Sequence, residues 1–300
     1  MLGNWQLLLI RIGESVLIVV LCIAAVIAII GPLLVSLGLK GMEAPTDPND
    51  VAELITSVFA AHWLVLVYIL GVTAIVLVVM MAVHSFVIAG CARVYADAER
   101  KVASLPAPAR DNMRVFTMER WLEGGKEGWW AVFWIYNAVW GIATMIIVVP
   151  ITMLAAVMLV FRDTLPGAMI ACGGCLGLIA FVLFLIPVFI VSGIWTQKAI
   201  VDAVARGLAG GDAMRAAWRE FRTDLGRHLG VAAVMFVVSV AASMVFSGLS
   251  AMGSFGRSSS YNIMMIPLQF WSSIASSIFS AAVSAWFLAC YTALAVETRP

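Results

Sequence analysis

The sequence predicts an all-α fold, a polytopic bundle of six transmembrane helices that forms one integral membrane domain over residues 1–300. Of its 300 residues, 63% are hydrophobic and only 12% are charged, whereas a soluble globular domain has roughly 45–50% apolar and about 25% charged residues. Uncharged stretches recur along the chain, and each exceeds the roughly 20 residues that a helix needs to cross a bilayer. Because backbone groups in lipid must bond within their own segment, these stretches are predicted to be helices and not strands.

Charged residues set the limits of the predicted spans. The apolar run after Arg11 is too long for the core of a signal peptide, so it is interpreted as a retained helix. No Asp, Glu, Lys or Arg lies inside any span, which argues against a proton pump or a charge-coupled transporter. The spans cover approximately residues 15–38, 56–91, 129–160, 167–196, 229–251 and 266–294.

The distribution of basic residues predicts the orientation. With six spans, only Lys40, Arg162 and Arg257 of the 18 basic residues fall on one side of the membrane. The positive-inside rule places the other 15 in the cytoplasm, together with both termini. The connections on the outside, about residues 40–53, 162–166 and 252–262, are too short to fold as domains.

Three cytoplasmic segments, residues 1–13, 93–127 and 198–228, are predicted to form amphipathic elbows before the outward spans. The last is the best formed: Asp212 is a plausible N-cap, and an apolar face with Trp218 opposes an arginine face. Such a helix either lies in the membrane interface, against anionic headgroups, or docks on the protein itself. The residues predicted at the lipid interface are Trp121, Trp129, Trp130, Arg215, Trp218, Arg219, Phe221 and Arg222.

A tryptophan followed by a basic residue opens each elbow. The runs are Trp5 to Arg11, Trp121 to Lys126 and Trp218 to Arg227. They suggest three repeats of one unit, an elbow followed by a helical hairpin. Chance is the alternative, because Trp and Arg are both common at a cytoplasmic interface.

The layout of six spans with a Trp-bearing elbow, together with the run Ala205-Arg206-Gly207…Ala213…Ala217-Trp218-Arg219, carries a resemblance. It is similar to a broad group of largely uncharacterised six-helix bacterial membrane proteins, which includes the membrane domain of some glycerophosphodiester phosphodiesterases. The resemblance implies a fold and a location in the bacterial inner membrane. It implies no reaction, because the catalytic domain of those enzymes is a separate soluble barrel that these residues do not supply.

Polar side chains inside the spans are few. The serines of the sixth span repeat at helical spacing, and Asn137 in the third span needs a partner. They form either a close helix–helix seam or a polar lining for a solute path. The serines are Ser273, Ser277, Ser280 and Ser284.

Cysteine and histidine give weaker signals. Cys172 and Cys175 have C-x-x-C spacing, which fits a disulfide or thiol exchange as well as simple close packing of small residues. His62 and His84 lie 22 residues apart on one span, so they cannot share a metal ion. No metal site, cofactor or catalytic residue is predicted.

The leading functional interpretation is a non-enzymatic scaffold, interaction or envelope-maintenance protein. Its expected partners are anionic membrane lipids and a membrane protein, and not nucleic acid. The first alternative is a transporter or lipid-handling protein for an uncharged or amphiphilic solute, and the second is a thiol–disulfide membrane enzyme. A polar cavity lined by Ser277, Ser280 and Asn137 would favour the first alternative, whereas a dry, tightly packed centre would favour the scaffold.

Overall fold

The computed structural model describes residues 2–36, 63–104, 113–160, 167–252 and 259–297. Within these ranges the chain is helical and contains no strand, so the predicted all-α class is confirmed. The predicted outside loops at 40–53 and 162–166 lie outside the described residues, and only the ends of the one at 252–262 are described. The elements are a 3₁₀ turn η1 (Leu2–Asn4), α1 (Gln6–Ser36), α3 (Trp63–Ala103), α4 (Met118–Val160), α5 (Gly167–Arg206), α6 (Gly210–Thr223), α7 (Leu225–Met252) and α8 (Ser259–Glu297).

These helices are long and apolar enough for a multi-pass membrane protein. Among the described residues five segments qualify as membrane spans: Gln6–Gly31, Val67–Ala103, Met118–Met153, Ile179–Arg206 and Ile274–Val296. A sixth results only if α6 and the following part of α7, which are bent by 96°, count as one broken span. Large apolar side chains remain exposed along these helices, as a lipid-facing surface requires.

Contacts divide the chain into two compact units. The smaller unit, Ile12–His84, contains most of α1 and the first half of α3. Two polar contacts join its helices: the Tyr68 hydroxyl donates to the Ala28 carbonyl oxygen at 3.3 Å, and His84 Nδ1 lies 2.5 Å from Glu14 Oε1.

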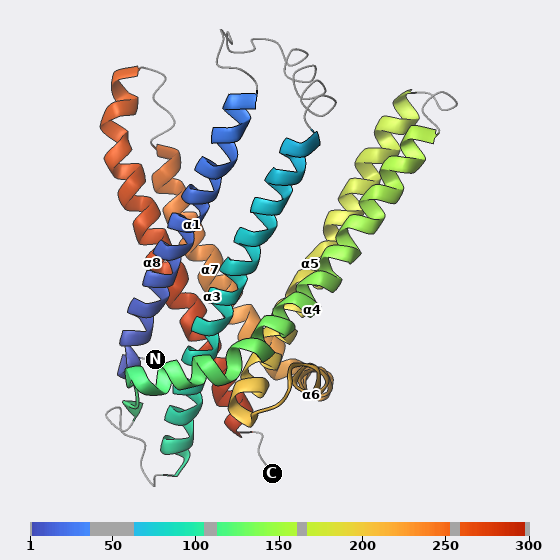
Figure 1. Ribbon diagram of the computed structural model, residues 1–300. Coiled ribbons are helices and arrows are strands. Elements are labelled where there is room, and N and C mark those ends of the chain that lie inside the picture. The colour runs from blue at the N-terminus through green and yellow to red at the C-terminus, as the bar shows by residue number, and fades with distance from the viewer. Residues whose placement is uncertain (1, 37–62, 105–112, 161–166, 253–258, 298–300) are drawn as a thin grey trace. The chain divides into compact units, whose positions relative to one another are not determined.

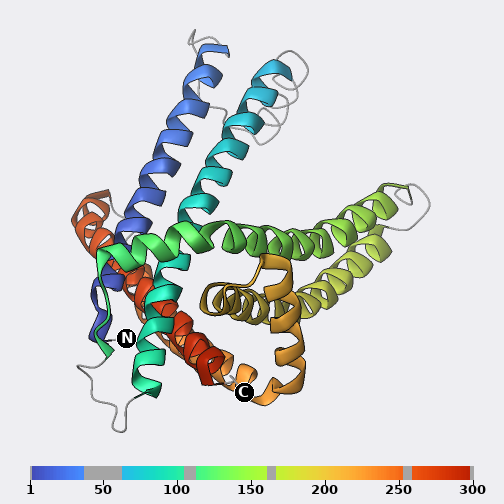
Figure 2. The ribbon, with the colours of Figure 1, turned by 60° about the horizontal axis from the view of Figure 1, so that its bottom comes forward.

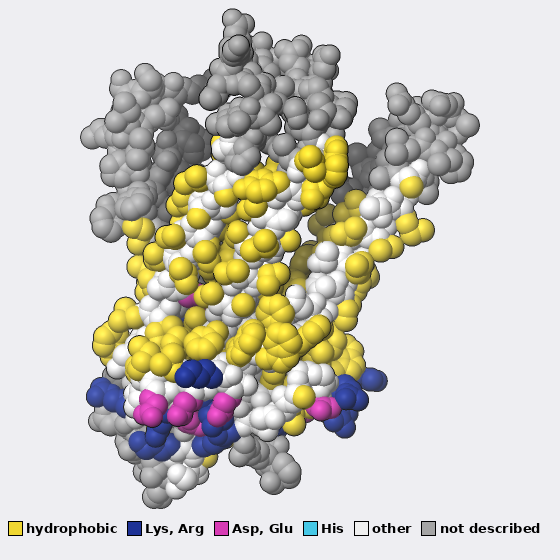
Figure 3. Space-filling view, in the orientation of Figure 1, with side chains coloured by type: hydrophobic (Ala, Val, Ile, Leu, Met, Phe, Trp, Pro, Cys, Tyr) yellow, Lys and Arg dark blue, Asp and Glu magenta, His cyan; other side chains and the backbone are white. Residues whose placement is uncertain are grey.

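The larger unit consists of Met1–Arg11 and Ser85–Pro300. In it α4 and α5 run side by side, α7 packs on α8, and α5 also contacts α6, α7 and α8 (Figures 1 and 2). Its largest fully buried apolar side chains come from five different helices, for example Leu7, Val94, Ile135, Ile200 and Leu288. We call residues 93–103, 118–127 and 198–227 the polar end of this unit, because charged side chains gather there beside a band of hydrophobic ones (Figure 3).

Glycines allow α3 and α4 to cross at very short range. A Cβ atom on Gly90 would lie 2.6 Å from the Trp121 ring and 2.7 Å from the Trp121 carbonyl oxygen. One on Gly124 would lie 2.4 Å from Arg93 Cβ. Only glycine fits such positions, and small residues at a crossing are typical of membrane helix pairs.

The first two elbows are not separate helices. In the first, α1 begins at Gln6 and continues into the predicted first span. Helix α3 continues through the start of the 93–127 segment, and α4 begins at Met118 and runs without a break into the predicted third span. Before α4, the chain at 114–117 has no regular secondary structure and is held by the buried Asn4 side chain, which accepts hydrogen bonds from Val115 N and Phe116 N and donates to the Met113 carbonyl. The Thr117 hydroxyl then caps α4 by accepting from Arg120 N at 3.2 Å.

The third elbow is a separate helix, as predicted, but its N-cap is different. Helix α5 extends to Arg206, and Gly207 makes the turn with a φ of +66°. Helix α6 is capped by Ala209, whose side chain makes no capping bond. The prediction of Asp212 as N-cap is wrong because Gly210 and Gly211 are themselves helical, which places Asp212 in the first turn, 2.7 Å from Arg215. The three elbows therefore differ in the described residues, and the threefold repeat stays a prediction.

Candidate functional site

Helix α6 docks on α5 along a narrow stripe of its surface. Ala213, Ala217 and Phe221 are buried, at the i, i+4 and i+8 spacing of one helical face. The Trp195 indole N–H of α5 donates to the Met214 carbonyl at 2.9 Å, and its ring lies 5.3 Å from that of Trp218. Trp218 remains 37% exposed. The helix thus packs on the protein through small residues and leaves Trp218 and its arginines at the surface.

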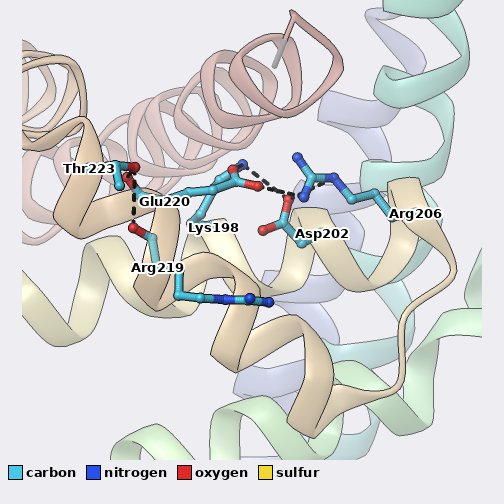
Figure 4. A network of polar contacts seen from close by, with 6 residues as sticks. All are labelled: Lys198, Asp202, Arg206, Arg219, Glu220 and Thr223. Carbon is cyan, nitrogen blue, oxygen red and sulfur yellow. Dashed lines mark hydrogen bonds and ion pairs between the residues drawn. The ribbon is translucent and has the colours of Figure 1, made fainter. Parts of the chain in front are cut away.

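A buried network of charges fixes this docking (Figure 4). Lys198 and Asp202 of α5 are 1% and 0% exposed. Lys198 Nζ donates to Asp202 Oδ1 at 3.0 Å and lies 2.6 Å from Glu220 Oε2 of α6. Because buried charges are costly without partners, this lysine joins the two helices at one defined register.

Arg206 of α5 is the second cation of the network and contacts both carboxylates. Its Nη1 donates to Glu220 Oε1 at 2.5 Å, and its Nε lies 3.6 Å from Asp202 Oδ1. Two cations thus face two carboxylates, so the network carries no net charge. The second oxygen of Asp202, Oδ2, is buried without a hydrogen-bond partner among the described residues.

The surroundings of Glu220 shift its titration. Burial by itself would raise the pKa of this carboxyl, but hydrogen bonds and charges from Lys198 and Arg206 outweigh burial and hold the pKa below its ordinary value of 4.5. Glu220 is therefore ionised at neutral pH, as its ion pairs require.

A pocket of about 750 Å³ lies between α5, α7 and α8. Its wall is mostly apolar and includes Phe189, Phe236, Phe279 and Phe287. Four serines supply its polar groups: Ser239 of α7 and Ser276, Ser280 and Ser284 of α8. Arg11 Nη2 donates to Ser284 Oγ at 2.9 Å, so a guanidinium lies at the edge of this pocket.

The structure brings only part of the predicted polar lining together. Ser280 and Ser284 line the pocket, whereas Ser277 is not among its lining residues. Asn137 is exposed on α4, and its amide N–H donates to the Phe133 carbonyl of its own helix at 2.7 Å. The side chain of Ser273 lies outside the described residues. The actual lining combines two predicted serines with two others.

The predicted interface residues divide in the same way. Trp130 is exposed and stacks on Phe133 at 5.7 Å, and Trp129 packs against Trp130 at 5.2 Å. Trp121, however, packs on Gly90, and its indole nitrogen is buried. On α6, Arg215, Arg219 and Arg222 are exposed, whereas Phe221 is buried against His228 at 6.0 Å.

The two cysteines of the predicted disulfide lie on one helix. Cys172 and Cys175 belong to α5, but their side chains lie outside the described residues. Among the described residues, Cys22 and Cys290 are free thiols. The described His, Cys, Asp and Glu side chains form no group of three that could hold a metal ion.

Sequence reasoning missed the buried network. Lys198 and Arg206 counted only as cytoplasmic basic residues, although the spacing of Lys198, Asp202 and Arg206 at i, i+4 and i+8 places them on one helical face. It also missed Glu14, which lies one residue before the first predicted span and is buried against His84. In both cases, a charged residue directly beside a predicted span was the sequence feature that could have indicated a buried ion pair.

Comparison of the chain with protein-family models, with curated proteins and with solved structures found no match. The buried network and the pocket are the features of the structure that bear on its function.

Proposed function

We propose that this multi-pass membrane protein binds an uncharged or amphiphilic molecule in the pocket between α5, α7 and α8, and that it handles lipid or lipid-like solutes without catalysing a reaction. The observation that carries the proposal is the pocket itself. Its volume of about 750 Å³ falls within the range of roughly 300–1,000 Å³ found for small-molecule sites.

The composition of the wall supports this ligand class. Phenylalanine rings favour an acyl or aromatic portion, and the serine hydroxyls can orient a small polar group by hydrogen bonds. No charged residue is among the described residues that line the pocket. The guanidinium of Arg11 at the edge, bonded to Ser284, provides a place for the polar head of an amphiphile.

The test is purification in lipid nanodiscs followed by mass spectrometry of the bound molecules. We expect a specific lipid or solute to be retained, and Ser280→Leu to reduce its amount several-fold by filling the pocket. Ser277→Leu is the matched control, since it makes the same change three residues earlier on α8, outside the pocket lining. Retention that is equal in the wild type and both variants would contradict the proposal.

A scaffold or envelope-maintenance role is the second proposal. It is supported by α6, which is fixed by buried ion pairs and presents exposed arginines to an outside partner. In the same experiment, a stoichiometric protein partner with only bulk lipid would favour the scaffold. Under either proposal, the location is the bacterial inner membrane with the polar end in the cytoplasm, as the basic residues and the resemblance to six-helix bacterial membrane proteins suggest.

A further inference from the structure

A second cavity, separate from the serine-lined pocket, lies where α6 meets α4 and α5. We call it the α6 groove. Its volume is about 930 Å³. One wall is apolar, with Ala138 and Ile142 of α4 and Trp195 of α5, and the other is the arginine-bearing side of α6 with Arg215 and Arg219. The groove thus joins an apolar surface to a cationic edge.

Arg219 distinguishes this groove from an ordinary crevice. Its guanidinium makes no hydrogen bond or ion pair with any described residue, and Figure 4 shows it extended apart from the buried network. Arg215, by contrast, is neutralised by Asp212 at 2.7 Å. The groove therefore contains one uncompensated positive charge, and a guanidinium binds phosphate oxygens with paired hydrogen bonds.

The apolar wall indicates how the rest of the ligand is held. Ile142 is 52% exposed on a helix that is apolar enough to span the membrane, so its surroundings are acyl chains. Helix α6 makes an angle of 96° with the apolar part of α7 that follows it. An amphipathic helix turned this far from an apolar neighbour lies along the membrane interface. This places its arginines at headgroup depth, above the apolar wall.

We propose that the α6 groove is a specific site for an anionic phospholipid, with the phosphate on Arg219 and an acyl chain along Ala138, Ile142 and Trp195. The single positive charge of Arg219 matches the single negative charge of a phosphodiester. Trp218 also lines the groove, and an indole N–H is a further hydrogen-bond donor for a headgroup. This site is independent of the solute pocket and goes beyond the proposed function.

The experiment uses the full chain in nanodiscs of phosphatidylglycerol and phosphatidylcholine, with native mass spectrometry of the retained lipid. We expect retained phosphatidylglycerol, and a loss of about tenfold in Arg219→Gln, because a charged hydrogen-bonded contact is replaced by a neutral one. Arg222→Gln is the matched control: it lies on the same helix, is exposed, removes the same charge and does not line the groove. It should retain the lipid as the wild type does.

Three results would overturn the proposal. Equal losses in Arg219→Gln and Arg222→Gln would show only diffuse attraction of anionic lipid to a basic helix. Retention of phosphatidylcholine equal to that of phosphatidylglycerol would show that the negative charge of the lipid does not contribute to binding. Displacement of the phospholipid by inorganic phosphate alone would assign the groove to a free anion.

A second variant tests the apolar wall without altering any charge. Ala138→Phe should fill the groove and reduce phosphatidylglycerol retention, and the melting temperature of each variant checks that it is folded. Neither groove variant should alter the molecule held in the serine-lined pocket, since Arg219 and Ala138 are not among its lining residues. Failure of this site and failure of the proposed function can thus be told apart. Unchanged phosphatidylglycerol retention in Ala138→Phe would also contradict the proposed acyl position.

Discussion

At the scale of single residues, the buried lysine of α5 is the residue of the described chain that depends most on its partners. Lys198 is 1% exposed and faces Asp202, which is fully buried, as well as Glu220 of a different helix. Removing a charge from water costs several kcal/mol, and an ion pair offsets this cost only when both partners are present. The arrangement therefore fixes the register of α6 on α5 more than it adds stability over an apolar contact.

The first prediction follows from this balance. Lys198→Met should destabilise the protein by about 3–5 kcal/mol, because it leaves the Asp202 carboxylate buried with weaker compensation. Thermal unfolding in detergent, followed by tryptophan fluorescence, measures the effect. Lys101→Met, which removes an exposed lysine, should leave the melting temperature nearly unchanged. The double variant Lys198→Met, Asp202→Leu should recover part of the loss; a double variant less stable than Lys198→Met would contradict this account.

The second prediction concerns pH and Glu220. Because its pKa in the folded protein lies below the ordinary value of 4.5, Glu220 contributes stability that is fully present above pH 4.5 and is lost as pH falls through the lowered pKa. The wild type should therefore lose stability below pH 4.5 more steeply than Glu220→Gln, which cannot titrate there. The slope of melting temperature against pH, compared between the two proteins, is the measurement. Parallel slopes would mean that the ion pairs with Lys198 and Arg206 do not hold in solution.

At the scale of elements, the crossing of α3 and α4 depends on the absence of side chains. Gly90 faces the ring and backbone of Trp121, and Gly124 faces Arg93. Close helix contact in membranes comes from packing and not from burial of apolar surface away from water, so these glycines are needed for the two backbones to approach.

The third prediction tests that crossing. Gly90→Ala should lower the melting temperature by several degrees, because its new methyl group would lie 2.7 Å from the carbonyl oxygen of Trp121, which cannot move without shifting α4. Gly141→Ala is the matched control within α4. Nothing lies within 4 Å of its added Cβ atom, so it should be neutral or slightly stabilising. If both variants melt alike, the close crossing is not formed.

At the scale of the whole molecule, the number of spans remains to be tested. Five described segments qualify, and the sixth depends on whether α6 with α7 crosses the membrane. The basic residues fit both counts, because with five spans Arg299 would replace Arg257 on the outside and the split would again be 15 to three.

The fourth prediction distinguishes the two counts. In a variant whose five native cysteines are replaced by serine, single cysteines at Arg222 and Arg257 should react with a membrane-impermeant maleimide from opposite sides. Cysteines at Lys40 and Arg162 should label from the same side as the one at Arg257. Labelling of positions 222 and 257 from one side would reduce the count to five and place the C-terminus on the side opposite to the N-terminus.

The sequence by itself determined the class of this protein. In lipid, the backbone groups of a long uncharged stretch must bond within the stretch itself, which makes it a helix. The all-α membrane fold could therefore be predicted from composition and spacing. The amphipathic α6 was predictable for the same reason, because its period reflects which face meets water. Its N-cap was not, because glycines at 210 and 211 are compatible with both a loop and a helix.

Only the tertiary structure decided which polar residues meet. Ser280 and Ser284 share a pocket with Ser239 of another helix, while Asn137 bonds to its own backbone. Lys198 is a surface cation by sequence and a buried one by structure, because Glu220 of α6, which lies 14 residues beyond Arg206 in the chain, forms an ion pair with it. Helical periodicity specifies the face of one helix, but the pairing of faces depends on side-chain volumes at the crossings, where Gly90 and Gly124 permit contact.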